Sequence, residues 1–215
     1  MSGAALPRRF IAGISALSAV VVALWAAPAE AQDPRTDPRA VTVIGSDPHG
    51  RRCLQGVSEG DTSDRTIADC TRALRNPRLS RESTLMLLVN RGVTFLRRSE
   101  GDPALADFDA AIVVDRRNGE AHLNRGAALV MLRQPGPAVA AITEALGLGV
   151  RDPQKAYLNR GAAREQLGDL RGAYEDYSTA LEISPDWGPA NTELARFARA
   201  RRSHLAGVLG ANDGP

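Results

Sequence analysis

The chain has 215 residues, with 27 basic and 25 acidic side chains and a net charge of +2 at pH 7. Nucleic acids and anionic membranes attract proteins with a clear basic excess, so this balance favours neither as a partner. The length suffices for one domain with a continuous core.

The first 31 residues have the composition of a secretory signal peptide. Arg8 and Arg9 precede an apolar run at residues 10–27, and small residues mark a cleavage site after Ala31. The run is short for a membrane span, and no second one follows it in the sequence. We therefore predict a periplasmic or secreted protein without membrane insertion, with an uncleaved anchor as the alternative.

The segment that follows this predicted signal is rich in proline, aspartate and arginine. Residues 32–50 therefore predict a disordered leader. Removing residues 1–31 leaves 25 basic and 24 acidic residues, so the mature chain is close to neutral.

The sequence contains two cysteines, Cys53 and Cys70. An even number in an exported protein indicates a disulfide, and two cysteines allow a single intramolecular pairing. A metal site, the alternative, would need further ligands, and only His49 lies nearby in the sequence.

The triplet Asn-Arg-Gly occurs at residues 90–92, 124–126 and 159–161, spaced by 34 and then 35 residues. Each glycine is followed after twelve and nineteen residues by alanine, and after sixteen by a large apolar residue. These recurring residues are Ala104, Ala138 and Ala173, then Phe108, Ile142 and Tyr177, then Ala111, Ala145 and Ala180. A fixed period of this size predicts stacked units, each of two helices with one buried face.

This pattern resembles the tetratricopeptide repeat (TPR). The resemblance implies an all-α solenoid of about three and a half helix-turn-helix units and a C-terminal capping helix. The implied N-terminal segment is a partial repeat at 51–84, whose first helix is eroded and which the disulfide holds in place. The segments that follow are full repeats at 85–118, 119–153 and 154–187, a capping helix at 188–207 and a tail at 208–215.

The repeated triplet divides into three roles. Glycine inside a helix costs about 1 kcal/mol relative to alanine, so a glycine repeated three times indicates close packing against the second helix of its unit. Asp107 and Asp176 stand sixteen residues after Arg91 and Arg160, which predicts ion pairs in the first and third units. Ala141 replaces the aspartate in the second unit, so Arg125 lacks this partner.

The resemblance places the asparagines on first helices that line a concave groove. An amide side chain both donates and accepts hydrogen bonds, which suits the main chain of an extended peptide. An equally weighted interpretation is that the amides make structural contacts. The groove residues so predicted are Asn90, Asn124, Asn159, Val89, Val93, Leu123, Ala127, Lys155 and Leu158. Because Lys155 is the only basic residue among them, an apolar groove fits better than a clamp for peptide carboxylates.

No catalytic or metal-binding constellation stands out, since the three histidines are scattered. We therefore predict a scaffold or adaptor of the cell envelope that binds a peptide or partner protein, without enzyme activity, cofactor or nucleic acid. Two alternatives stay open: a hydrolase of cell-wall peptides, and a self-assembling protein whose groove holds its own leader or a second copy, and thus an oligomer.

Overall fold

The computed structural model describes the backbone of residues 47–210 and the side chains of residues 47–200. Within this part of the chain all regular structure is helical. The helices are α2 (Pro48–Ser58), α3 (Asp64–Leu74), α4 (Arg81–Arg97), α5 (Gly101–Val114), α6 (Gly119–Met131), α7 (Pro135–Leu148), α8 (Pro153–Gln166), α9 (Leu170–Ile183) and α10 (Gly188–Gly210). The predicted all-α class is confirmed.

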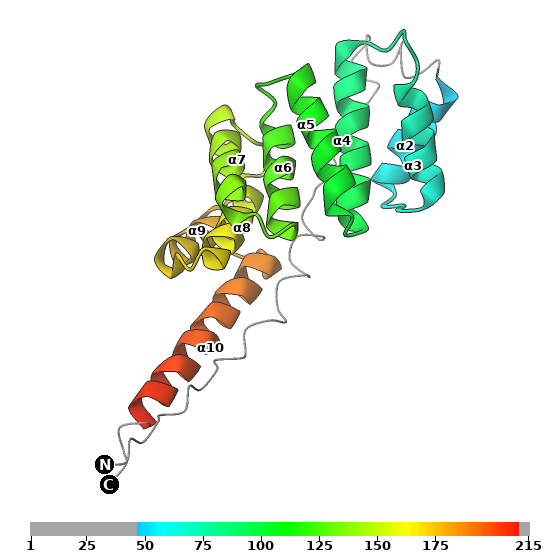
Figure 1. The fold of residues 1–215 in the computed structure, drawn as a ribbon. Coiled ribbons are helices and arrows are strands. Elements are labelled where there is room, and N and C mark those ends of the chain that lie inside the picture. Colours follow the sequence, from blue (N-terminus) through cyan, green and yellow to red (C-terminus); the bar gives the residue numbers. More distant parts are fainter. Residues whose placement is uncertain (1–46, 211–215) are drawn as a thin grey trace, which may run out of the picture.

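Consecutive helices form hairpins that stack one after another, and α10 extends from the C-terminal end (Figure 1). The strongest contacts join the pairs α2–α3, α4–α5, α6–α7 and α8–α9. Each second helix also contacts the first helix of the next pair, and the first helices α2, α4, α6 and α8 contact one another in sequence. The first helices therefore form one layer, which we call the first-helix layer.

The repeated glycines lie where helices of one pair cross. A Cβ atom on Gly92 would stand 2.6 Å from Cε1 of Phe108, and one on Gly126 would stand 2.3 Å from Cγ1 of Ile142. Gly161 meets the ring of Tyr177 in the same way. Real Cβ atoms do not approach other carbons this closely, so the packing role predicted for the glycines is confirmed.

In each of the three full repeats, the turn between the first and second helix contains a left-handed residue. Gly168 has a φ of 80°, and glycine adopts this conformation without strain. The equivalent positions of the two preceding units carry Ser99 and Arg133, with φ angles of 61° and 58°. A side chain at such an angle costs roughly 1 kcal/mol, so only the third of these turns is relaxed.

The N-terminal pair differs from its prediction, because its first helix is present rather than eroded. Helix α2 begins three residues inside the segment predicted as a disordered leader. The Asp47 side chain caps it by accepting from the His49 N–H, with Pro48 in the first turn. Three of its residues are buried apolar side chains on one face: Cys53, Leu54 and Val57. Packing of this face fixes the helix even though it contains few apolar side chains.

Other boundaries also move. Helix α4 begins at Arg81, before the predicted repeat start at 85, because the Ser80 hydroxyl accepts from the N–H of Ser83 at 3.0 Å. Helix α10 runs to Gly210 and so enters the predicted tail at 208–215. The predicted signal peptide and the first part of the predicted leader lie outside the described residues.

Candidate functional site

The three repeated asparagines lie in the first-helix layer, at equivalent positions of α4, α6 and α8. Asn90 and Asn159 are each 1% exposed, and Asn124 is 3% exposed. The Oδ1 atoms of Asn90 and Asn159 are buried and have no hydrogen-bond partner among the described residues. Each such unsatisfied acceptor costs about 1–3 kcal/mol relative to a hydrated one. An apolar side chain at these two positions would fill the core without this cost.

The apolar residues predicted to line a groove are buried in the core rather than open on a surface. They are Val89, Val93, Leu123, Ala127 and Leu158. Successive first helices contact each other directly. The expectation of an open apolar surface at these positions is therefore corrected, and a role in ligand binding stays a prediction.

The arginines of the triplets form the two ion pairs that their spacing predicts. Arg91 donates to both carboxylate oxygens of Asp107, with a shortest distance of 2.6 Å, and Arg160 does the same to Asp176, at 2.7 Å. In the second unit Arg125 instead donates to Asp109 of the preceding unit, at 2.6 Å. The three arginines are therefore structural partners of the second helices.

Arg91 and Arg160 also reach the unit before their own. Arg91 donates to the Thr71 hydroxyl at 2.9 Å, and Arg160 donates to the Thr143 hydroxyl at 3.4 Å. Thr71, Asp109 and Thr143 occupy equivalent places on their second helices, two residues beyond the aspartate position. This set of contacts connects each unit to its predecessor.

The remaining basic residues of α4, α6 and α8 also have oxygen partners. Lys155, the only basic residue of the predicted groove, donates to Asp152 at 2.8 Å and remains partly exposed. Arg164 contacts Asp176, while Arg81 and Arg97 donate to backbone carbonyls. An acidic ligand would therefore have to compete with these partners for every cation of the described first-helix layer.

A second polar cluster, which the sequence did not reveal, joins α8, α9 and α10. Arg196 donates two hydrogen bonds to Glu165, at 2.8 and 2.6 Å, and one to Glu193. The Tyr177 hydroxyl donates to the same Glu165 at 3.0 Å. Glu193 follows Asn159 by 34 residues, which makes it the equivalent of the asparagine on α10. That spacing was the one available signal for the cluster.

The cluster shifts the pKa values of its members. Burial opposes ionisation of Glu165, but hydrogen bonds from Arg196 outweigh it and lower the pKa of this carboxyl group. Hydrogen bonding to Glu165 raises the pKa of Arg196. Burial and the nearby Glu165 charge raise the pKa of Tyr177. At neutral pH the cluster thus consists of ionised Glu165, protonated Arg196 and a neutral phenol, an arrangement suited to fixing α10.

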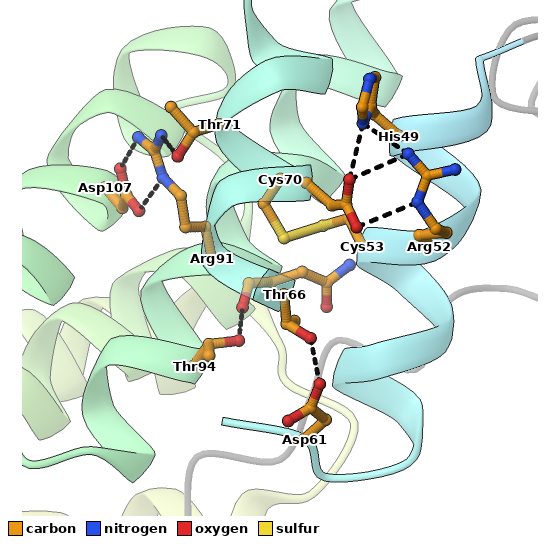
Figure 2. The surroundings of a disulfide bond; sticks show 12 residues. His49, Arg52, Cys53, Asp61, Thr66, Cys70, Thr71, Arg91, Thr94 and Asp107 are labelled. Atoms are coloured by element: carbon orange, nitrogen blue, oxygen red, sulfur yellow. Dashed lines mark hydrogen bonds and ion pairs between the residues drawn. A yellow bond between two sulfur atoms is a disulfide. The ribbon is translucent and has the colours of Figure 1, made fainter. Parts of the chain in front are cut away.

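Cys53 and Cys70 are joined by a disulfide, which links α2 to α3 (Figure 2). On one side of it, Asp69 accepts from Arg52 at 3.1 Å and contacts Nδ1 of His49 at 2.6 Å. On the other side lie Arg91 and its partners. The hydrogen bonds from Arg52, opposed by burial and supported by His49, lower the pKa of Asp69 from 3.8 to about 2.

This lowered pKa predicts an acid-sensitive contribution to stability. Below pH 4 the unfolded Asp69 carboxyl group binds protons that the folded one does not, so stability falls between about pH 4 and pH 2. We expect Asp69→Asn to reduce stability at pH 5 and to flatten this part of the profile. Urea denaturation across this range measures it, with Asp102→Asn on the exposed surface of α5 as the control. Equal acid dependence in wild type and Asp69→Asn would contradict the assignment.

A cavity of about 220 Å³ lies beside α2 and α3. Charged side chains of both signs line it, among them Arg52, Glu59, Asp61 and Arg65. Among the described residues no group of three or more histidine, cysteine, aspartate or glutamate side chains is placed to hold a metal ion. No described helix is both long and apolar enough to span a membrane.

No protein-family model matches the chain. Solved structures give a clear likeness. The first TPR domain of human RPAP3 is 29% identical, with a TM-score of 0.52, over 56% of this chain and 94% of that domain. The described residues adopt the TPR fold. The first TPR of Spaghetti (RPAP3) bound to the HSP90 peptide SRMEEVD is 28% identical, with a TM-score of 0.51, over 55% of this chain and 96% of that one.

A further structure extends the likeness in fold alone. The crystal structure of MamA has a TM-score of 0.57 over 69% of this chain and 84% of that one, at 21% identity.

Curated relatives point to the same repeats. RNA polymerase II-associated protein 3 of Xenopus laevis is 32% identical over 118 residues, 55% of this chain and 18% of the relative. The human protein of that name is 30% identical over the same length. The chain thus spans about a fifth of the length of the curated relatives it matches.

These relatives correct the predicted location. RNA polymerase II is a nuclear enzyme, and the matched proteins carry its name and come from frogs, mouse, rat and human. This finding contradicts a periplasmic or secreted protein. The prediction depended on the composition of residues 1–31. A cleavable leader shares such a composition with other short apolar runs. These residues lie outside the part of the chain that the structure describes.

Proposed function

We propose that this protein is an interaction adaptor whose first-helix layer binds a segment of a partner protein. The observation that carries the proposal is the likeness to TPR domains that bind peptides. One such domain is bound to the HSP90 peptide SRMEEVD, and another, 27% identical, is in complex with the HSP70 peptide SGPTIEEVD. The relatives and neighbours carry no enzyme name, which supports the absence of catalysis without testing it.

The chemistry of the layer favours a partner segment of apolar character. The described arginines and the lysine of α4, α6 and α8 are held by carboxylates, hydroxyls or carbonyls. An acidic tail would have to break these contacts, and each broken pair leaves another charge unpaired. The unsatisfied Oδ1 atoms of Asn90 and Asn159 can accept from the N–H groups of a peptide main chain, which would reach these buried atoms where the first helices separate.

Two probes test the proposal on the full chain. For the HSP90 heptapeptide SRMEEVD we expect weak binding, with a Kd above about 100 μM. From a displayed library of random peptides we expect enrichment of apolar segments that bind at micromolar concentration. Tight binding of SRMEEVD would contradict the preference for apolar segments but would still support the adaptor function. If neither probe bound, the adaptor function itself would be wrong.

Leucine substitutions separate the ligand-binding and structural roles of the asparagines. In Asn90→Leu/Asn159→Leu the unsatisfied amides are replaced by apolar groups of similar volume, so we expect stability to stay the same or to rise by about 1 kcal/mol. Binding of the selected peptide should fall at least about tenfold through loss of hydrogen bonds. Thermal denaturation and fluorescence anisotropy measure the two effects.

The contrary result is equally clear. If the double substitution lowers stability while peptide affinity stays unchanged, the amides are structural and the binding site lies elsewhere. Asn118→Ala serves as the control, because Asn118 accepts from the Ala121 N–H as the N-cap of α6, outside the repeated triplets. We expect this substitution to lower stability by about 1 kcal/mol without changing affinity.

A further inference from the structure

Helix α2 is short and buries few apolar side chains. It has 11 residues, and a helix of this length is marginal in water without tertiary packing. Its buried apolar side chains are Cys53, Leu54 and Val57, whereas α4 buries Leu87, Leu88, Val89, Val93 and Leu96. The attachment of α2 therefore depends on a few specific contacts, of which the disulfide is one.

Those contacts join α2 to two helices. The disulfide connects it to α3, as do the hydrogen bonds from Arg52 to Asp69 (Figure 2). Towards α4, Cys53 and Val57 form one apolar cluster with Leu87, which is fully buried. Helix α2 thus covers the N-terminal end of the first-helix layer.

The other contact from α4 is made by Arg97. Its Nη1 atom donates to the backbone carbonyl of Val57 at 2.9 Å, at the C-terminal end of α2. Among the described residues Arg97 makes no ion pair with a carboxylate, and burial lowers the pKa of its guanidinium group. A partly buried cation whose partner is a carbonyl at a helix C-terminus is stabilised by that helix end. The environment of Arg97 therefore depends on α2 staying in place.

We propose that the Cys53–Cys70 disulfide is a redox latch that holds α2 against α4. In the oxidised chain α2 covers Leu87, and the backbone carbonyl of Val57 on α2 accepts a hydrogen bond from Arg97. When the disulfide is reduced, α2 separates from the layer, Leu87 becomes exposed, and Arg97 loses its carbonyl partner. The N-terminal end of the first-helix layer then exposes an apolar side chain, Leu87, and further along α4 a cation without a carboxylate partner, Arg97.

The chemical step needs a dithiol reductant. One of its thiolates attacks a sulfur of the disulfide, forms a mixed disulfide, and releases the other cysteine as a thiolate that takes up a proton. The second thiol of the reductant then displaces the remaining cysteine, so two electrons and two protons pass to the chain. Both cysteines are fully buried, so the attack takes place when α2 opens transiently.

The disulfide closes a loop with a sequence separation of 17 residues. This loop length determines how strongly the bond is expected to favour the closed form of α2. Without the bond, the open form of α2 should become more populated by a factor on the order of a hundred. The contacts among helices α4 to α9 do not involve the disulfide and should be unaffected.

Hydrogen exchange with mass spectrometry on the full chain tests the latch, with and without excess dithiothreitol. We expect exchange of α2 amides to rise on the order of a hundredfold on reduction, with exchange in α6 to α9 unchanged. The variant Cys53→Ala/Cys70→Ala should exchange like the reduced chain whether or not the reductant is present. An unchanged α2 would overturn the proposal. So would an equal rise in all helices, since the disulfide would then stabilise the fold as a whole.

Arginine labelling gives a second readout that does not depend on exchange rates. Phenylglyoxal modifies accessible guanidinium groups, so labelling of Arg97 should increase at least about tenfold on reduction as its contact with α2 opens. Arg160 provides the matched control, because its partner Asp176 lies far from α2 in the sequence of helices. Equal labelling of Arg97 in both redox states would contradict the release of α2.

Discussion

Asp176→Ala is expected to lower the free energy of unfolding by about 3–5 kcal/mol. Asp176 is 2% exposed, and it accepts from Arg160 at 2.7 Å and from Arg164 at 2.9 Å. Removing the carboxylate leaves the partly buried Arg160 guanidinium group without a counter-charge, and leaves Arg164 only its longer contact to Asp169 at 3.8 Å. The cost comes mainly from this unpaired charge rather than from the lost attraction.

Urea denaturation measures this loss of stability. The ion pair between Arg125 and Asp109 provides the control. Asp109, the partner of Arg125, has a side chain that is 51% exposed, so Asp109→Ala should cost about 1 kcal/mol or less. Adding Arg160→Met to Asp176→Ala should recover part of the stability, since one unpaired charge is removed. Equal losses at Asp176 and Asp109 would mean that burial does not control the strength of these pairs.

Gly126→Val is the second substitution with a large expected effect. The added Cβ would stand 2.3 Å from Cγ1 of Ile142 and 3.4 Å from the backbone oxygen of Ala138. Helices α6 and α7 would have to separate, so we expect a loss of about 3 kcal/mol. In a protein of this size that loss lowers Tm by roughly 6–12 °C.

A glycine without close neighbours gives the matched comparison. Gly147 lies inside α7, and a Cβ added to it meets nothing within 4 Å. Gly147→Ala should therefore raise stability by about 0.5–1 kcal/mol, because alanine loses less backbone entropy on folding. If both substitutions destabilised the protein to a similar degree, steric contact with Ile142 could not be the reason for the repeated glycine.

Features that depend on local spacing were predictable from the sequence. The glycine crossings and the pairs of Arg91 and Arg160 follow from a period of 34 to 35 residues, since each unit solves the same packing problem. The partner of Arg125 was missed because it stands sixteen residues before the arginine, in the unit that precedes it. A period shows which positions are equivalent, but it does not show which neighbour supplies a missing charge.

Features that depend on the distance between helices were not predictable. The sequence placed the three asparagines on one helix face, but their burial arises from the close approach of α4, α6 and α8. Helix α2 was missed because it contains few apolar side chains, and those few together with a disulfide hold it in place. The cluster around Glu165 joins residues up to 31 positions apart, and no short pattern connects them.

The arginine contacts across unit boundaries have a consequence for the way the solenoid opens. Arg91, Arg125 and Arg160 each bond to the second helix of the preceding unit, through Thr71, Asp109 and Thr143. A unit in the interior of the array therefore cannot unfold without disturbing two neighbours, whereas a terminal unit disturbs only one. Such a nearest-neighbour chain is a one-dimensional cooperative system, in which opening starts at an end and advances one unit at a time.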